Sequence, residues 1–459
     1  MFSIPLFVPC AALSLACGLF ADDKAAAQPA RPAPTIAITG VSVIPMDRDE
    51  VLASQTVIIA NGRITYIGVP RAAPPGATAV DGRGKFLIPG IAEFHAHVPS
   101  GGQAAHAHRT LSLYALAGVM TARGMLGAPM HLALRDSIAD GQVFGPRLLT
   151  SGPSFNGNSV TSPEQAMAMV HAQKEAGYDL LKIHPGVPRA AFDSLAATAN
   201  RLGIPFAGHV PLEVGLDVAI TAKHSTIDHL DGLIEAMYAG PAPLTSRQNG
   251  FFGLGIMGQL DLSRFGRIVD RVRASGVAMV PTQILTDNYA SDATGDELTS
   301  LPEMRYWVPQ QIANWRAAKN NLLSQTPVSR QQRLAYIALR RRFIKALYDA
   351  GVPFLLGSDA PQLWNVPGFS THRELAALVA AGLTPYQALR TGTVDVAKYM
   401  KEDGRSGVVR AGARADLILL DANPLLNIDN SLRISGVVVN GRWIGPAERE
   451  QLLAALTAR

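Results

Sequence analysis

The chain has 459 residues, 48% of them hydrophobic and 17% charged, which is the composition of a compact globular protein with room for one large domain and a smaller one. Although the formal net charge is +5, the sequence has no block of lysine and arginine and no basic stripe with interleaved aromatic residues. We therefore expect no nucleic-acid partner. No apolar run after the first 20 residues approaches the length of a membrane span, so we expect no stable membrane span.

The first 35 residues have the pattern of an export signal. An apolar segment, Ile4–Phe20, precedes a run of small residues that ends at Ala27. Residues 1–27 are therefore predicted to be a signal peptide and residues 28–35 a linker. We expect an exported, periplasmic protein, with a secreted form or a lipoprotein as the alternatives.

Both cysteines, Cys10 and Cys17, lie inside this predicted leader, and Cys17 is the residue that a lipoprotein would use. The mature chain would then hold no thiol. That excludes disulfides, a cysteine nucleophile and thiolate metal ligands.

Both ends of the remaining chain have the pattern of short strands. Turns such as Asn61-Gly62 and Asn440-Gly441 separate runs of aliphatic and β-branched residues. We expect residues 36–88 and 403–446 to pair into one small β-sandwich, which leaves residues 89–402 as the main domain. Residues 447–459 are predicted to form a C-terminal helix.

The middle of the chain alternates short apolar strands with helical segments, such as 163–176 and 189–202, which is the pattern of parallel βαβ units in an α/β fold. Eight such strands predict a (β/α)8 TIM barrel. A doubly wound open sheet is the alternative, but no glycine-rich phosphate loop follows any strand. The predicted strands are 90–97, 118–125, 146–152, 178–184, 204–210, 226–230, 277–283 and 353–360.

Two of the predicted connections, 231–260 and 284–330, are unusually long. Loops at the C-terminal ends of strands overhang a barrel's active site, so these segments could be lids or substrate walls. The alternative is that the aromatic residues of the second connection pack on one another. These residues are Tyr289, Tyr306, Trp307 and Trp315.

Polar residues stand at the ends of several predicted strands. His95 and His97 are two positions apart on one strand, so both side chains point to the same face, where neutral imidazoles could share a divalent cation. Four more strands end in a residue of this kind, namely Lys182, His209, His229 and Asp359. This ordering predicts a metal site at the C-terminal rim of the barrel.

Six segments carry a resemblance to a known family: 89–97 with its two histidines, Asp179–Ile183, Ala207–His209, Ile227–His229, Gly357–Ala360 and Gly412–Leu417. Together they resemble the amidohydrolase superfamily, in particular its imidazolonepropionase- and prolidase-like branch. The resemblance covers nearly all of the chain after the leader. It implies a TIM barrel with the active site of a metal-dependent hydrolase.

The resemblance also implies a set of metal ligands. His95, His97 and Asp359 would bind one divalent ion, and His209 and His229 a second. Lys182 would bridge the two ions after carbamylation by CO2, because a free ammonium has no lone pair to offer. Two Zn2+ ions are expected because the set is rich in histidine, although manganese, cobalt or iron would also fit. The alternative for Lys182 is an unmodified lysine in a salt bridge.

The implied reaction is hydrolysis of a C–N bond, amide or peptide-like, by a metal-bridged hydroxide. Asp359 would act as proton shuttle and His229 would assist at the substrate carbonyl. Dipeptides and N-acyl amino acids are the expected substrates. Two alternatives remain open: a mononuclear deaminase or cyclic-amide hydrolase of the same superfamily, and a metal-containing binding protein without catalysis. The presence of Asp359 argues against the last.

Five further residues are expected to contact the small-molecule substrate: His184, Tyr238, Gln362, His372 and Arg373. His372 or Arg373 could hold a substrate carboxylate, although Arg373 could equally form a salt bridge. Prolidase-like relatives often carry a Gly-His pair after the third strand, whereas residues 151–158 contain no histidine, so a dipeptidase assignment does not transfer directly. Barrels of this size commonly associate, which favours a homo-oligomer.

Overall fold

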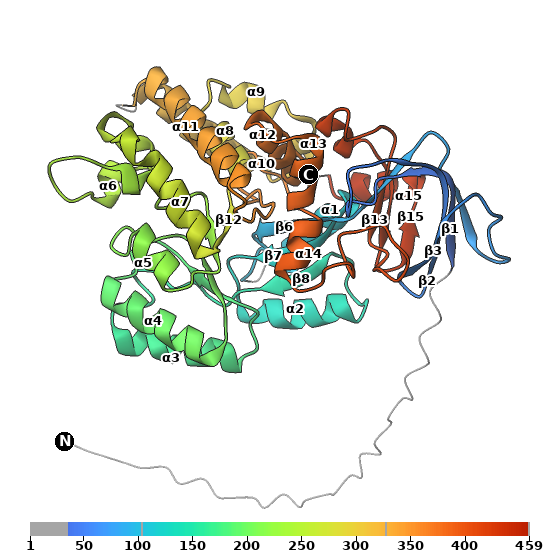
Figure 1. Ribbon diagram of the computed structural model, residues 1–459, viewed down its shortest axis with the longest axis horizontal. Coiled ribbons are helices and arrows are strands. Elements are labelled where there is room, and N and C mark those ends of the chain that lie inside the picture. Colours follow the sequence, from blue (N-terminus) through green and yellow to red (C-terminus); the bar gives the residue numbers. More distant parts are fainter. Residues whose placement is uncertain (1–34, 102–103, 326–327, 458–459) are drawn as a thin grey trace, which may run out of the picture. The chain divides into compact units, whose positions relative to one another are not determined.

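A computed structural model describes residues 35–101, 104–325 and 328–457 (Figure 1). The predicted signal peptide and nearly all of the predicted linker lie outside these ranges. Within them, no helix combines the length and the apolar character that crossing a membrane requires.

Strands from the two ends of the chain join in one mixed sheet. The antiparallel pair of β5 and β13 makes this connection, with Pro89 opposite Leu417 and Phe86 opposite Leu420. The sheet order is β15-β14-β13-β5-β1-β2-β3, with β4 also paired to β1. The two chain ends were predicted to pair into one small β-sandwich, and their strands do pair, continuously in a single eight-stranded sheet. Its members are β1 (Ile36–Val43), β2 (Leu52–Ala60), β3 (Arg63–Gly68), β4 (Thr78–Asp81), β5 (Phe86–Pro89), β13 (Leu417–Leu420), β14 (Ile434–Val439) and β15 (Arg442–Ile444).

The two faces of this sheet bury different cores, because successive side chains of a strand point to opposite sides. Leu417 and Leu419 belong to an apolar cluster that the sheet makes with its own strands. Ile418 and Leu420 belong to the large cluster that also contains the core of the α/β part. The sheet is therefore packed against the rest of the chain as well as on itself.

The middle of the chain holds two sheets of parallel strands, ordered β6-β7-β8 and β12-β11-β10-β9. Parallel bridges link them: Ser151 with Leu180 between β8 and β9, and Met279 with Phe354 after β12. A third bridge, Ala96 with Ala360, leads back to β6. Followed from one strand to the next, these pairings therefore lead from β6 back to β6. The predicted eighth strand, 353–360, is only a bridged segment. The named strands are β6 (Ile91–Ala96), β7 (Val119–Gly124), β8 (Arg147–Thr150), β9 (Leu181–Ile183), β10 (Phe206–Gly208), β11 (Thr226–Asp228) and β12 (Ala278–Val280).

Helices connect these strands, and they include the two predicted around residues 163–176 and 189–202 (Figure 1). Ser162 caps the first of these with a side chain that accepts from the backbone of Gln165. The α-helices are α1 (Ala104–Leu116), α2 (Pro129–Ala139), α3 (Pro163–Glu175), α4 (Arg189–Leu202), α5 (Leu216–Thr221), α6 (Ser246–Asn249), α7 (Phe265–Ser275), α8 (Gln283–Ala290), α9 (Gly295–Thr299), α10 (Pro309–Gln325), α11 (Arg330–Asp349), α12 (Phe369–Ala380), α13 (Pro385–Thr391), α14 (Val394–Tyr399) and α15 (Pro446–Ala455). Short 3-10 helices are η1 (Glu235–Met237), η2 (Leu254–Gln259), η3 (Leu262–Arg264), η4 (Pro302–Tyr306) and η5 (Ile428–Leu432).

The aromatic residues of the second long connection mostly pack within the protein. Tyr306 and Trp307 are buried, and the ring of Tyr306 stacks on Phe369 at 5.3 Å between centroids. The ring centroid of Trp315 lies 6.1 Å from that of Trp364. Tyr306 and Trp315 thus pack on aromatic residues outside the connection, and these contacts do not decide between the two alternatives for it.

Candidate metal centre

Three of the predicted ligands lie within reach of one common ion. One potential ligand atom from each of His95, His97 and Asp359 falls within 4.8 Å of the others. His97 Nε2 is 2.8 Å and His95 Nε2 is 3.5 Å from Asp359 Oδ1. The extended backbone of β6 directs both histidines to one side, and Asp359 reaches them from the bridged segment with a left-handed φ of 63°. This conformation suits aspartate better than most residues.

The other three predicted ligands surround this group. Lys182 Nζ at β9 lies 3.3 Å from His95 Nε2. The His229 ring is 4.5 Å from the rings of both His95 and His209, measured between centroids. His229 Nδ1 is 3.7 Å from Asp359 Oδ2. The six residues predicted from the sequence therefore gather at one place.

A fixed partner faces one nitrogen of each of three histidines. His95 Nδ1 faces Asp228 Oδ2 at 2.8 Å, His209 Nδ1 pairs with Asp231 Oδ2 at 2.7 Å, and His229 Nδ1 lies 2.8 Å from Thr282 Oγ1. Such contacts set the tautomer and the ring orientation, and they leave Nε2 as the nitrogen that can bind a metal ion. Sequence inspection missed these partners: Asp228 lies on a different strand from His95, and Asp231 and Thr282 lie in the loops after β11 and β12.

Several buried atoms at this place lack hydrogen-bond partners among the described residues. They include His229 Nε2 and Asp359 Oδ1, although the latter lies 2.8 Å from His97 Nε2. Buried acceptors without a donor are costly unless a cation is present. The donor set of imidazole nitrogens and a carboxylate is also one that divalent transition metals prefer. The residues present therefore fit a divalent metal ion.

Burial keeps these imidazoles neutral, as metal ligation requires. Desolvation lowers the pKa of His95 and His229 well below the ordinary value and that of His209 to about 3. Desolvation also lowers the pKa of the fully buried Lys182 ammonium, although Asp228 and Asp359 oppose the shift.

A buried carboxylate, Glu93, braces the strand that carries the two histidines. It accepts from Ser358 N at 2.8 Å, Ser358 Oγ at 2.7 Å, Thr371 Oγ1 at 2.8 Å and His95 N at 3.0 Å. Desolvation raises its pKa to about 7. Glu93 ties β6 to the segment before Asp359 and to α12, and the sequence pattern alone did not single it out.

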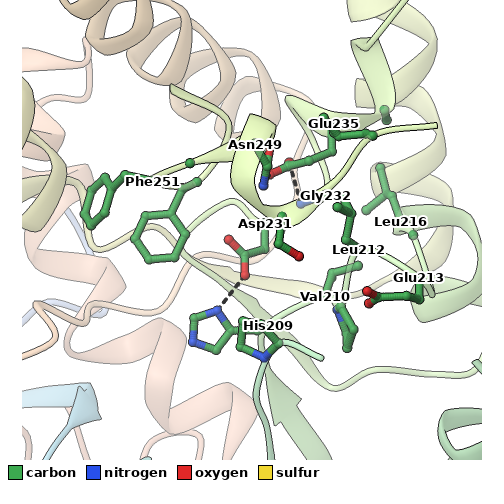
Figure 2. A pocket seen from close by; sticks show the side chains of 18 of the residues that line it. His209, Val210, Leu212, Glu213, Leu216, Asp231, Gly232, Glu235, Asn249 and Phe251 are labelled. Atoms are coloured by element: carbon green, nitrogen blue, oxygen red, sulfur yellow. Dashed lines mark hydrogen bonds and ion pairs between the residues drawn. The ribbon is translucent and has the colours of Figure 1, made fainter. Parts of the chain in front are cut away.

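A cavity of about 590 Å³ adjoins the histidines (Figure 2). The loops after β10 and β11 form its walls, and His209 and Phe252 belong to both the cavity and the histidine cluster. The Phe252 ring stacks on His229 at 4.8 Å and on His209 at 5.9 Å, with 16° between the planes in each case. Apolar side chains such as Leu212 and Leu216 line much of the cavity, and three acidic residues, Glu213, Asp231 and Glu235, face it.

Phe252 was not predicted as a site residue. The available signal was the run Gly250-Phe251-Phe252-Gly253 inside the first long connection, where the flanking glycines have φ of 64° and 88°. The hydroxyl of Tyr336 donates to the carbonyls of both phenylalanines at 3.1 and 3.0 Å, which fixes the loop.

Two of the predicted substrate contacts are engaged with other parts of the protein. His372 is buried on α12, where its ring nitrogens lie 2.9 Å from Ser431 Oγ and 2.7 Å from Ala117 O, so helix packing turns it away from the rim. Arg373 is engaged in an ion pair with buried Glu303, which is the salt-bridge alternative.

The other three predicted contacts are placed as follows. His184 stacks on His209 at 5.0 Å between centroids and thus lies beside the centre. Gln362 bridges to Asn365 just beyond Asp359. Tyr238 pairs through its backbone with Leu260 and is not among the residues that line the cavity. A role of these three in substrate binding stays a prediction.

Comparisons with known proteins agree with this architecture. Solved structures with the same fold include a candidate prolidase from Bifidobacterium longum (TM-score 0.67, 23% identity, 93% of this chain and 100% of that one). A bottromycin amidohydrolase gives a TM-score of 0.70 at 24% identity, over 93% of this chain and 90% of that one. A Xaa-Pro dipeptidase with methionine in its active site gives a TM-score of 0.66 at 17% identity, over 90% of this chain and 100% of that one.

Sequence comparison adds one short match and one long one. A curated relative, adenine deaminase of Paracoccus denitrificans (strain Pd 1222), is 35% identical over 69 residues, which span 14% of this chain and only 11% of that protein. The amidohydrolase family model, in contrast, matches residues 86–444, from β5 to the end of β15. This chain therefore belongs to the amidohydrolase family.

Proposed function

We propose that the protein is a metal-dependent hydrolase that cleaves a C–N bond at the rim of a closed (β/α)8 barrel. The observation that carries this proposal is the convergence of His95, His97 and Asp359 within 4.8 Å. The circuit of parallel bridges that returns to β6 supports the closed barrel. Strand C-termini, where these residues stand, are where barrel enzymes carry their chemistry.

His95, His97 and Asp359 would hold one divalent ion, and His209 and His229 a second, with carbamylated Lys182 between them. Lys182 Nζ lies 3.3 Å from His95 Nε2, and its burial favours the neutral amine that reacts with CO2. Bound divalent ions would polarise a substrate carbonyl and make hydroxide available near neutral pH. The histidine-rich set supports Zn2+.

The residues of the chain supply the proton transfers and the positioning. Among the described residues, Asp359 is the one carboxylate that contacts both halves of the histidine cluster, so it is placed to accept the proton of the attacking water. Water oxygen bonds to the carbonyl carbon, the C–N bond breaks, and the leaving nitrogen receives that proton. The pairing of His229 Nδ1 with Thr282 keeps its ring fixed during these steps.

The adjoining cavity supports a small-molecule substrate of dipeptide or N-acyl amino acid type. Its largely apolar wall and its position against His209 are those of a pocket for the side chain or acyl group of such a substrate. Solved relatives of the same fold include a Xaa-Pro dipeptidase and Aspergillus niger ochratoxinase.

The test combines metal content with turnover. We expect close to two ions per chain in protein purified with bicarbonate and without added chelator, and release of free amino acid from a panel of dipeptides and N-acyl amino acids. Asp359→Asn is the matched inactive control. Absence of bound metal after reconstitution with zinc and manganese would contradict the proposal.

Deamination is a second candidate, favoured by the match to adenine deaminase over 69 residues. It predicts ammonia release from adenine-type substrates with one ion per chain. Ammonia release together with an inert dipeptide panel would replace the first proposal with this one.

A further inference from the structure

Asp228 is a fully buried carboxylate for which the proposed reaction has no direct use. It ends β11, one residue before His229, and its side chain reaches across to β6. Its Oδ2 lies 2.8 Å from His95 Nδ1. Neither of these two atoms has a hydrogen-bond partner elsewhere among the described residues. Within the described part of the chain, each is thus the only polar group placed to satisfy the other.

The second oxygen of Asp228 is held in turn by two residues. Thr226 Oγ1 donates to Asp228 Oδ1 at 2.7 Å, and Arg123 Nη2 lies 3.5 Å away. Arg123 itself is 2% exposed, and a fully buried carboxylate such as Asp228 needs a counter-charge of this kind.

The guanidinium of Arg123 has little freedom to move. Its Nε donates to Phe94 O at 2.7 Å and its Nη2 to Thr226 Oγ1 at 3.1 Å, while the group lies 4.9 Å above the Phe94 ring. A rigid chain of contacts therefore runs from Arg123 on β7 through Asp228 on β11 to His95 on β6.

We propose that Asp228, held by Arg123 and Thr226, is a positioning residue that fixes His95 with Nε2 toward the metal centre. This inference rests on the proposed function. It assigns a role to interior residues that do not contact the substrate. Loss of their contacts should weaken metal binding. A carboxylate behind an imidazole raises the basicity of the nitrogen on the far side and holds the ring in one orientation.

The experiment measures Co2+ affinity of the full-length protein by titration against a competing chelator, independently of turnover. Asp228→Asn keeps the shape of the side chain but removes its charge, and we expect Co2+ binding about 10–100-fold weaker than in the wild type. Asp395→Asn is the matched control, because Asp395 also pairs with an arginine, Arg390, at 2.8 Å but lies outside the centre. Its Co2+ affinity should equal that of the wild type.

A double-variant cycle tests the chain of contacts. If Arg123 acts through Asp228, then Arg123→Met weakens Co2+ binding in the wild-type background and has little further effect in Asp228→Asn. Additive effects would overturn the role of Arg123, and unchanged Co2+ affinity in a folded Asp228→Asn would overturn the proposal. A wild type that binds no Co2+, Zn2+ or Mn2+ would instead refute the proposed function.

If circular dichroism shows that Asp228→Asn does not fold, Thr226→Val tests the same proposal. It removes only the hydroxyl that donates to Asp228, and it should weaken Co2+ binding by a few fold. Thr198→Val is its control, since the buried Thr198 hydroxyl has no hydrogen-bond partner among the described residues. Equal Co2+ affinity in the two valine variants would overturn the proposal.

Discussion

The two halves of the candidate metal centre are supported in different ways. The half that contains His95, His97 and Asp359 is braced from the interior. Glu93 accepts four hydrogen bonds around it, and Asp228 stands behind His95 at 2.8 Å. None of these supporting residues lines the cavity beside the centre.

The half that contains His209 and His229 is supported by residues from loops. Asp231, which pairs with His209, and Phe252, which covers both rings, also line the cavity. Changes behind the first half should therefore alter metal retention alone, whereas changes around the second half should alter substrate binding as well.

The largest expected effect comes from the residue that joins the halves. Asp359→Asn keeps a side chain that tolerates the left-handed backbone at φ 63° but removes the proton acceptor. We expect turnover to fall by about 10²–10⁴-fold with the fold retained. Steady-state kinetics and circular dichroism check this. Wild-type turnover in the variant would remove Asp359 from the mechanism.

Lys182 gives the next largest effect, because as a carbamate it would contact both halves. In Lys182→Ala, metal affinity and turnover should each fall by about tenfold or more, which is the scale of a lost metal contact. Formate or acetate should restore part of both, since a small carboxylate can occupy the vacated space.

Lys319→Ala is the matched control for this rescue. Lys319 is equally buried, but its ammonium donates to three backbone carbonyls, those of Asn288, Tyr289 and Ser291, at 2.7–2.9 Å. Its loss should lower stability without any response to carboxylates. If carboxylates rescue neither variant and Lys182→Ala keeps its normal metal content, Lys182 is unmodified in the wild type.

The same contrast shows how far the sequence could predict this site. His95 and His97 were predictable because the two-residue period of a strand places them on one face, and Lys182, His209 and Asp359 because they end strands. Asp228 and Glu93 were not, since their roles depend on which strands face each other across the interior. Phe252 lies in an irregular loop, where no periodic pattern of the sequence predicts the direction of a side chain.

The contacts of His372 were not predictable for a related reason. Its place after the last strand indicated the rim, but the rotation of α12 turns it toward Ala117 and Ser431. The pairing of the two chain ends was predictable, but their continuous order in one sheet was not, because short strands alone do not reveal how they connect.

A smaller effect concerns the pH dependence of stability at the start of α8, which Glu374 contacts. Buried Glu374 accepts from Gln283 N at 2.8 Å and Ile284 N at 2.6 Å, and desolvation raises its pKa from 4.5 to about 8. The folded state therefore holds this proton more tightly than the unfolded state does. The stability contributed by the protonated group is present below pH 4.5 and is lost as the pH rises to about 8.

Glu374→Gln lacks this titration. We expect the wild-type Tm to fall by a few degrees relative to the Tm of Glu374→Gln between pH 5 and pH 8. Paired scans at each pH cancel the titration of every other group. A constant difference in Tm would mean that Glu374 is ionised throughout.

The smallest expected effect is at Thr282, the neutral partner of His229. Thr282→Val keeps the branched shape and removes the hydroxyl that lies 2.8 Å from His229 Nδ1. A neutral partner polarises the imidazole less than a carboxylate does, so Co2+ affinity should fall by a few fold, below the roughly tenfold or greater loss expected at Asp228. Thr286→Val is the control, because the buried Thr286 hydroxyl has no hydrogen-bond partner among the described residues. A loss at Thr282 as large as that at Asp228 would mean that orientation alone, and not the buried charge, sets the metal affinity of both halves.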